Sequence, residues 1–138
     1  MRICIILANY YPEISSRLMR GAIQSLKKNK IKNYKKITTP GIFEIPVAIS
    51  KNITMYDAFI VLGCVIKGKT NHFELITKTT TDAIMNLSIK YKKPIANGII
   101  SCFNKKQANE RSSLDKKNKG KEATEAALHM LRIFKNVR

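Results

Sequence analysis

Acidic residues are scarce in this chain: 9 Asp and Glu stand against 26 Lys and Arg, and the formal net charge is +17 at pH 7. An excess of this kind attracts nucleic acid or anionic substrates without any recognition of sequence. The lysines, however, are spread over predicted helix faces and turns, with no RNA-binding aromatic platform and no basic recognition helix. The composition therefore favours solvated basic faces, and we expect no specific nucleic-acid partner.

Long hydrophobic runs and paired cysteines are also missing. No apolar run approaches membrane-spanning length, and the N-terminus does not join a basic region to a signal-type apolar stretch. The chain has an odd number of cysteines, Cys4, Cys64 and Cys102, and they form no C-x-x-C motif. This pattern favours buried, reduced thiols over disulfides or a zinc site. We therefore expect one cytoplasmic domain over residues 1–138, with no membrane contact and no metal.

Three largely apolar segments predict strands at residues 3–8, 58–66 and 95–102, and residues 34–38 are a short candidate for a fourth strand. Apolar residues spaced three or four apart predict helices between and after them, at residues 12–30, 46–52, 71–91 and 104–111, and beyond a polar loop at 112–118. The expected buried stripes are Ile14, Leu18, Ala22 and Leu26; then Phe73, Ile76, Ala83, Ile84, Leu87 and Tyr91; and finally Ala123, Ala126, Ala127, Met130, Leu131 and Phe134.

Strands that alternate with helices predict an α/β fold. The expected architecture is a three-layer, flavodoxin-like domain, in which a four-stranded parallel sheet carries helices on both faces. In such folds ligands bind beyond the carboxyl ends of the strands. We therefore look for functional groups in the loops that follow each strand.

The loop after residues 58–66 contains a misleading motif. Residues 63–70 fit the letters G-x-x-x-x-G-K-[ST] of a nucleotide-binding P-loop. A P-loop must curl its backbone between the two glycines, whereas residues 64–66 continue an apolar strand. No predicted strand ends on an acidic residue that could hold a metal ion. A nucleotide-binding site is the less favoured interpretation.

The same loop could bind a single phosphate group and transfer protons. One phosphate group could be held at the helix start by the amides and side chains of Lys69 and Thr70. Asn71 and Glu74 could cap the same helix. His72 follows directly, and histidine suits proton transfer at neutral pH, although a surface histidine without a function is an equal alternative. Arg111 could clamp a phosphate, or it could be an ordinary solvated charge.

Other candidate residues are more ambiguous. Tyr10 and Phe43, at strand ends, could stack on a flat heterocycle or could simply contribute to packing. His129 lies beside expected core positions of the last helix, and we interpret it as structural.

Four blocks of sequence occur in a characteristic order: residues 9–14 (NYYPEI), 40–46 (PGIFEIP), 62–73 (LGCVIKGKTNHF) and 107–120 (QANERSSLDKKNKG). They resemble the lumazine synthase family of the riboflavin pathway. The patterns P-G-x-x-E-[IL]-P and G-x-T-x-H-[FY] are together highly specific, and the similarity spans essentially the whole chain.

This resemblance implies an enzyme that condenses 5-amino-6-(D-ribitylamino)uracil with 3,4-dihydroxy-2-butanone 4-phosphate to give 6,7-dimethyl-8-ribityllumazine, without a cofactor. It implies that His72 moves protons. It also implies contacts to the pyrimidine and its ribityl chain from Tyr10, Ile42, Phe43, Glu44, Cys64, Val65, Ile66 and Asn97. The implied phosphate ligands are Lys69, Thr70 and Arg111.

The resemblance further implies a homo-oligomer. Its site lies between subunits, and the neighbour supplies Asn97, Arg111, Lys119 and Glu122. Family members form pentamers, which in some cases build decamers or shells of sixty subunits.

Three positions depart from the usual family pattern. Asn97 stands where an aromatic or apolar residue normally faces the pyrimidine, Lys67 replaces arginine or glutamate, and Asn71 replaces proline or glutamate. Two alternatives remain open: a related riboflavin synthase, which would leave the phosphate ligands without a purpose, and a basic module that binds phosphate or nucleic acid.

Overall fold

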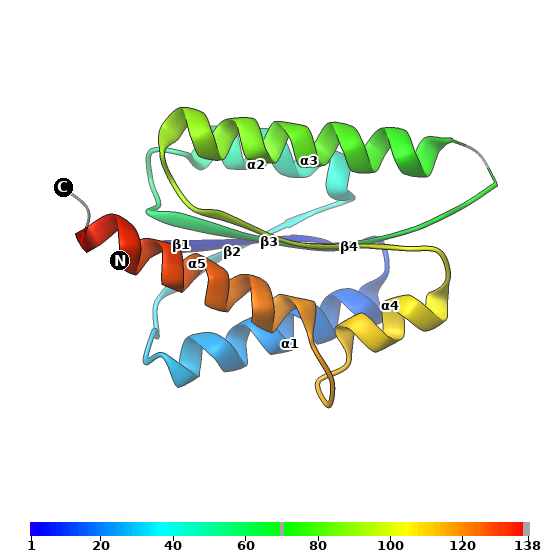
Figure 1. The fold of residues 1–138 in the computed structure, drawn as a ribbon, viewed down its shortest axis with the longest axis horizontal. Helices are drawn as coiled ribbons and strands as arrows, with labels where there is room; N and C mark the ends of the chain where they lie inside the picture. Colours follow the sequence, from blue (N-terminus) through cyan, green and yellow to red (C-terminus); the bar gives the residue numbers. More distant parts are fainter. Residues whose placement is uncertain (70, 137–138) are drawn as a thin grey trace.

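The computed structural model describes residues 1–69 and 71–136 and contains one parallel sheet in the strand order β2-β1-β3-β4 (Figure 1). The strands are β1 (Ile3–Ala8), β2 (Tyr34–Thr39), β3 (Ala58–Ile66) and β4 (Ile95–Cys102). All four predicted strands are present, and all of them run in the same direction. We call the two ends of this sheet the amino end, where the strands begin, and the carboxyl end, where they finish.

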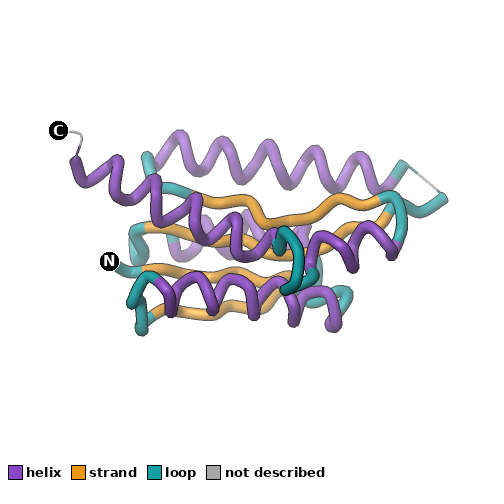
Figure 2. Tube along the Cα trace, turned by 60° about the horizontal axis from the view of Figure 1, so that its bottom comes forward, coloured by secondary structure: helices purple, strands orange, loops and turns teal. Residues whose placement is uncertain are grey.

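Helices cover both faces of the sheet, as the sequence predicted. They are α1 (Pro12–Lys28), the 3-10 helix η1 (Ile42–Glu44), α2 (Ile45–Asn52), α3 (His72–Tyr91), α4 (Lys105–Ser112) and α5 (Lys119–Asn136). The helices α2 and α3 lie on one face, and α1, α4 and α5 lie on the other (Figures 1 and 2). This is the expected three-layer, flavodoxin-like arrangement.

The central strands divide the core into two halves. Along β1, alternate side chains point to opposite faces. Ile3, Ile5 and Leu7 pack with α1 and α5, whereas Cys4 and Ile6 pack with α2 and α3. Both halves exclude water, which explains why β1 and most of β3 are apolar without interruption.

The predicted stripe of α1 is confirmed, because Ile14, Leu18, Ala22 and Leu26 are all at most 1% exposed. The predicted stripes of α3 and α5 are partly wrong. The exposed members are Tyr91 at 38%, Ala126, Met130 at 37% and Phe134 at 43%. In α5 the predicted Ala123 and Ala127 are buried, and so are Gly120, Thr124 and Leu128, which the predicted stripe did not include. Small residues at these positions allow this helix to approach α1 closely. His129, expected beside the core, is exposed.

Two smaller predictions can also be compared with the structure. Asn71 is the N-cap residue of α3, as predicted, but its side chain makes no capping hydrogen bond, so only the predicted capping interaction is wrong. The three cysteines are free and buried, as expected. Within the described part of the chain, no helix is long and apolar enough to cross a membrane.

Asn118 joins three helices just before α5. Its side-chain amide donates to the carbonyl oxygens of Arg17 (3.0 Å) and Ser112 (2.7 Å), and its side-chain oxygen accepts from the backbone N–H of Lys121 (3.0 Å). Gly120 lies next to it, where a Cβ would stand 2.0 Å from the carbonyl oxygen of Leu18. This junction holds the start of α5 against α1, at the carboxyl end of the sheet.

We expect Asn118→Ala to lower the free energy of unfolding by roughly 2–4 kcal/mol, since it removes a helix cap and leaves buried carbonyl groups without donors. Chemical denaturation monitored by circular dichroism measures the change. Asn33→Ala, at an exposed position before β2, is the control and should alter stability by less than about 0.5 kcal/mol. Equal stability of the two variants would contradict the role given to Asn118.

Candidate functional site

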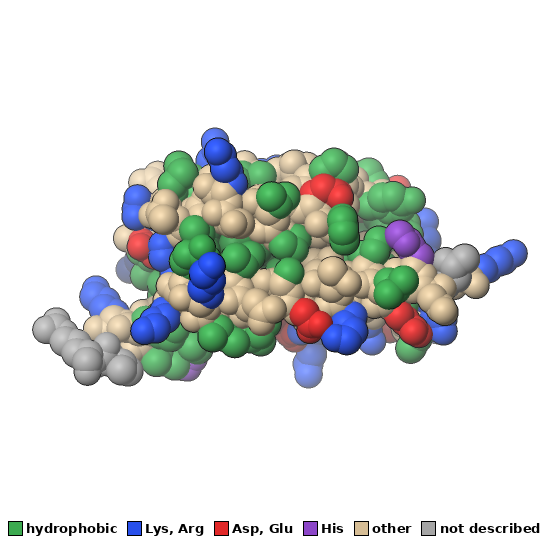
Figure 3. All heavy atoms as spheres, turned by 90° about the horizontal axis from the view of Figure 1, so that it is seen from above, with side chains coloured by type: hydrophobic (Ala, Val, Ile, Leu, Met, Phe, Trp, Pro, Cys, Tyr) green, Lys and Arg blue, Asp and Glu red, His purple; other side chains and the backbone are tan. Residues whose placement is uncertain are grey.

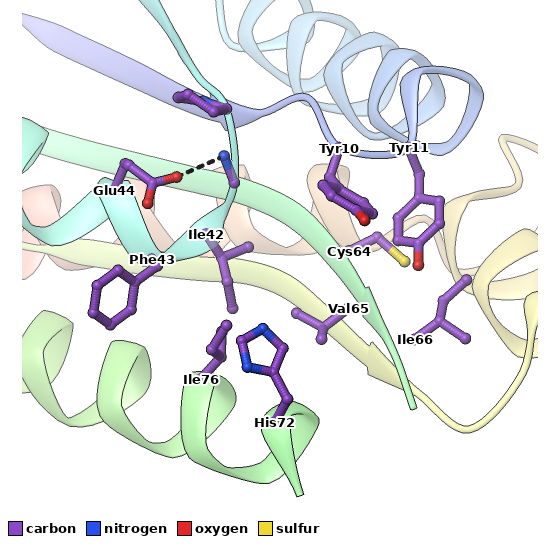
Figure 4. A pocket seen from close by; sticks show the side chains of 12 residues that line it. Tyr10, Tyr11, Ile42, Phe43, Glu44, Cys64, Val65, Ile66, His72 and Ile76 are labelled. Carbon is purple, nitrogen blue, oxygen red and sulfur yellow. Dashed lines mark hydrogen bonds between the residues drawn. The ribbon is translucent and has the colours of Figure 1, made fainter. Parts of the chain in front are cut away.

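A cavity of about 370 Å³ opens at the carboxyl end of the sheet (Figure 4). Its walls come from the loop after β1, the segment of η1, the end of β3 and the start of α3. The lining residues are Tyr10, Tyr11, Pro40, Gly41, Ile42, Phe43, Glu44, Cys64, Val65, Ile66, His72 and Ile76. Four segments far apart in sequence therefore meet where a parallel α/β fold is expected to bind its ligand.

Gly63 allows η1 to lie on the sheet and form one wall of this cavity. A Cβ at this position would stand 2.9 Å from Cγ2 of Ile42 and 3.1 Å from Cβ of Ala8. The backbone of Gly63 is part of β3, which continues in regular pairing with β4 through Ile66. Because this segment is a strand and does not curl around a phosphate, the P-loop interpretation is excluded.

The carboxylate of Glu44 is fixed at the other end of η1. One of its oxygens accepts a hydrogen bond from the backbone N–H of Gly41 at 2.9 Å (dashed in Figure 4). The hydroxyl of Thr39 donates to the carbonyl oxygen of Gly41 at 2.8 Å, which holds the same turn. A carboxylate has several acceptor positions, so Glu44 can still accept hydrogen bonds from hydroxyl groups of a ligand.

Two tyrosines stand over the end of β3. The rings of Tyr10 and Tyr11 are 5.0 Å apart in an edge-to-face arrangement, and Tyr10 is 70% exposed. The Tyr11 ring packs against the core, and burial, followed by the neighbouring Cys64 thiol, raises the pKa of its phenol. Tyr10 thus presents an aromatic surface suited to stacking on a planar ligand.

His72 is the first residue of α3, and its imidazole is turned toward Ile42 and Val65 (Figure 4). The exposed Phe43 stands on the η1 side of the same opening. The cavity therefore combines an aromatic surface, an oriented carboxylate, apolar walls and an imidazole that can exchange protons with a bound ligand.

A second cavity, of about 270 Å³, lies beside β4 and shares no lining residue with the first. Its lining residues are Ile99, Ile100, Ser101, Arg111, Lys117, Lys119 and Glu122. The guanidinium of Arg111 donates to the carbonyl oxygen of Ser101 at 2.9 Å, and the ammonium of Lys119 lies 3.4 Å from Glu122. Three cations around a small cavity form a suitable site for a phosphate group.

Three sequence candidates lie outside both cavities or outside the described residues. Asn97 is exposed on β4, and its side-chain oxygen accepts from the N–H of Ile99 at 3.0 Å. Lys69 is exposed in the turn before α3. Thr70, expected to bind phosphate, is not among the residues that the structure describes.

Sequence reasoning missed Tyr11 and Ile76 as lining residues of the first cavity. Tyr11 adjoins the recognised Tyr10, and Ile76 lies one helical turn beyond His72. This helical spacing was the available signal, because residues four apart on a helix share a face. In the second cavity, Lys117 was missed because it lies in an irregular loop with no periodicity.

Burial makes Cys64 a poor acid. It raises the pKa of the Cys64 thiol to about 12, and the neighbouring Cys102 adds to the effect. In the unfolded chain the same thiol ionises near its ordinary value of about 8.5. The Cys64 thiol therefore keeps its proton to a higher pH in the folded protein than in the unfolded chain. Below about pH 9 this difference does not reduce the free energy of unfolding, but as the pH rises from there toward about 12 the unfolded chain loses the proton first and the free energy of unfolding falls.

We therefore expect the free energy of unfolding to fall more steeply above about pH 9 in the unaltered protein than in Cys64→Ala. Urea denaturation at a series of pH values measures both curves. The lysines, and the tyrosines other than Tyr11, titrate equally in the two proteins, so their contributions cancel in the comparison. Tyr11 contributes to the difference, because Cys64 also raises the pKa of its phenol. Two curves separated by a constant offset would contradict this assignment.

Comparison with known proteins gives a consistent result. The profile of the family described as 6,7-dimethyl-8-ribityllumazine synthase matches residues 1–135. The chain is 42% identical to the 6,7-dimethyl-8-ribityllumazine synthase of Bartonella tribocorum, over 96% of this chain and 89% of that protein. It is 43% identical to the protein of the same name from Bartonella bacilliformis, over 95% and 88%. The corresponding protein of Campylobacter curvus is 36% identical, over 99% and 90%.

Proposed function

The chain belongs to the 6,7-dimethyl-8-ribityllumazine synthase family, and we propose that it catalyses the reaction for which that family is named. The substrates are 5-amino-6-(D-ribitylamino)uracil and 3,4-dihydroxy-2-butanone 4-phosphate. One observation carries this proposal: every residue expected to contact the pyrimidine or ribityl chain, except Asn97, lines the first cavity together with His72.

In our proposal the first cavity binds the pyrimidine substrate. The exposed ring of Tyr10 stacks on the heterocycle, and the backbone at the end of β3, from Cys64 to Ile66, meets its polar edge. Ile42 and Phe43 lie along the ribityl chain. Glu44, already oriented by Gly41, accepts hydrogen bonds from ribityl hydroxyl groups.

We assign proton transfer to His72. Condensation of the pyrimidine amine with the ketone forms an imine and releases water, and the later loss of phosphate and the ring closure also require protons to move. An imidazole at the mouth of the cavity can accept and return these protons. Holding two substrates in register contributes further, up to about 7–11 kcal/mol of the barrier in favourable cases.

Arg111 is our main phosphate ligand, assisted by Lys119, with Lys69 and Thr70 completing the site from the turn before α3. Arginine binds phosphate in a bidentate manner, and the Ser101 carbonyl orients this side chain beside β4. Glu122 holds the ammonium of Lys119. In this proposal Asn97, exposed on β4, lies against the pyrimidine bound by the neighbouring subunit.

We propose a homo-oligomer with the site between neighbours, in which the first cavity of one chain and the second cavity of the next form one site. In one chain the cation cavity and the His72 cavity have no residue in common. Exposed apolar side chains are available for such contacts, including Leu75, Met85 and Ile89 on α3. Figure 3 shows hydrophobic side chains spread over the face of the molecule that α2 and α3 cover. A pentamer is the proposed unit, and assembly into decamers or sixty-subunit shells would build on it.

We propose the cytoplasm as the compartment, since three free, buried thiols suit a reducing environment.

Mixing the purified protein with both substrates should produce the fluorescence of the lumazine product. In Arg111→Ala we expect the KM for the butanone phosphate to rise about 10- to 100-fold, with a much smaller change for the pyrimidine, because a charge-assisted contact to phosphate is lost. Arg20→Ala, an exposed arginine of α1 outside both cavities, is the control. Equal changes for the two substrates would refute the phosphate assignment, and product from the lumazine alone would indicate a riboflavin synthase.

Mixed oligomers test whether the site is shared. His72→Ala and Arg111→Ala are each expected to be slow at low butanone phosphate concentration. The two variants are unfolded and then assembled together in equal amounts. An interface is intact when an Arg111→Ala chain supplies His72 and a His72→Ala chain supplies Arg111, which happens at about one quarter of the interfaces. Activity should then recover to about a quarter of the unaltered level. No recovery, despite native mass spectrometry showing mixed oligomers, would place the whole site within one chain.

A further inference from the structure

Positive charge gathers at the amino end of the sheet, opposite both cavities. The lysines and arginines that precede a strand or end a helix there are Arg2, Lys27, Lys28, Lys30, Lys32, Lys51, Lys90, Lys92, Lys93, Arg132 and Lys135. Among the described residues at this end, Asp57 is the one acidic residue, and it already accepts the backbone N–H of Arg2 at 2.6 Å. The N-terminus and the last turn of α5 lie at the same end, on the left of Figure 1.

Helix dipoles explain only part of this gathering. Lysines in the last turn of a helix, such as Lys27 and Lys28 in α1, interact favourably with the carbonyl groups there. Lys30, Lys32 and Lys92 lie beyond their helices. Lys30 and Lys92 adopt the left-handed region, with φ of 60° and 53°, which glycine enters without cost and lysine does not. Both positions therefore keep a cation at the expense of backbone strain.

A hollow of about 630 Å³ lies within this basic end. Its lining residues are Lys27, Lys30, Ile31, Lys32 and Tyr34. Arg132 of α5 is held nearby, because its guanidinium donates to the side-chain oxygen of Asn29 at 2.8 Å. Cations that surround a recess with an aromatic ring suit a strand whose phosphates meet the charges and whose bases stack on the ring.

We propose that the amino end of the sheet binds single-stranded nucleic acid through its phosphates, without reading its sequence. The binding surface, which we call the amino-end surface, consists of the hollow together with Lys92 and Arg132. A recess with a tyrosine fits an extended strand better than it fits a flat bilayer. Because this surface lies at the other end of the sheet, binding here leaves both cavities open.

Fluorescence anisotropy of a labelled oligothymidylate of about 20 nucleotides tests the proposal with the assembled protein. Contact with about four phosphates predicts a loss in affinity of about 50-fold between 50 and 200 mM KCl. An affinity that does not change with salt, or no binding at 50 mM KCl, would overturn the proposal.

The combined variant Lys27→Gln, Lys30→Gly, Lys32→Gln and Lys92→Gly should weaken this binding at least about tenfold. Its melting temperature should not fall, because glycine relieves the two left-handed positions. Its lumazine synthase activity should also be unchanged. Weaker binding with unchanged melting temperature and activity would separate a role in binding from a role in folding. The anisotropy measurement does not depend on the synthase reaction, so it would test the binding proposal even if the unaltered protein were inactive as a synthase.

A matched control removes the same number of charges at the opposite end. Lys105→Gln, Lys106→Gln, Lys116→Gln and Lys121→Gln, all exposed, should change oligonucleotide affinity by less than about threefold. Equal loss in both variants would mean that net charge, and not this surface, attracts the strand.

Two further measurements distinguish the ligand. Tyr34→Leu should weaken binding about fivefold or more if bases stack on the ring. Vesicles that contain anionic phospholipid, at equal phosphate concentration, should compete poorly with the oligonucleotide, and tighter binding to the vesicles would overturn the proposal in favour of a membrane surface.

Discussion

The parallel pairing of β3 with both β1 and β4 determines what lies at each end of this molecule. Since every strand runs in the same direction, every loop that follows a strand opens at the carboxyl end, and the helices α1, α2, α3 and α5 finish near the amino end. Tyr10, Glu44 and His72 are therefore brought to one cavity although long stretches of chain separate them. The same direction of the helices gathers the lysines of their last turns at the opposite end.

Much of this arrangement could be predicted because the signals were local and strong. Unbroken apolar runs identified the buried strands, and the four-residue spacing from Ile14 to Leu26 identified the inner face of α1. The stripe of α5 could not be assigned in the same way. Its apolar residues cover more than one face, and packing against α1 selects the small residues Ala123 and Ala127 while Met130 and Phe134 stay exposed. Periodicity indicates a helix but not which of two apolar faces is buried.

The candidate site was predictable to a similar degree. The sequence blocks named the side chains of the first cavity, and the fold brings them together. The resemblance implied that Arg111 and Lys119 act from a neighbouring subunit. What the sequence could not provide was the cavity beside β4 that these two side chains line, since that cavity depends on how α4 and α5 pack. Asn118 and Gly120 control this packing through contacts with α1 that span about a hundred residues of sequence, and no short pattern reports contacts of that length.

The position of both chain ends has a practical consequence for handling the protein. Met1 lies beside Asp57, and α5 continues past Arg132 to Asn136, so the first residue and the end of α5 both lie at the end of the sheet opposite Tyr10 and His72. Tags for immobilisation can thus be placed at either end without obstructing substrate entry. The same attachments would cover the lysine-rich recess around Tyr34, so cleavable tags are the appropriate choice for studies of that surface.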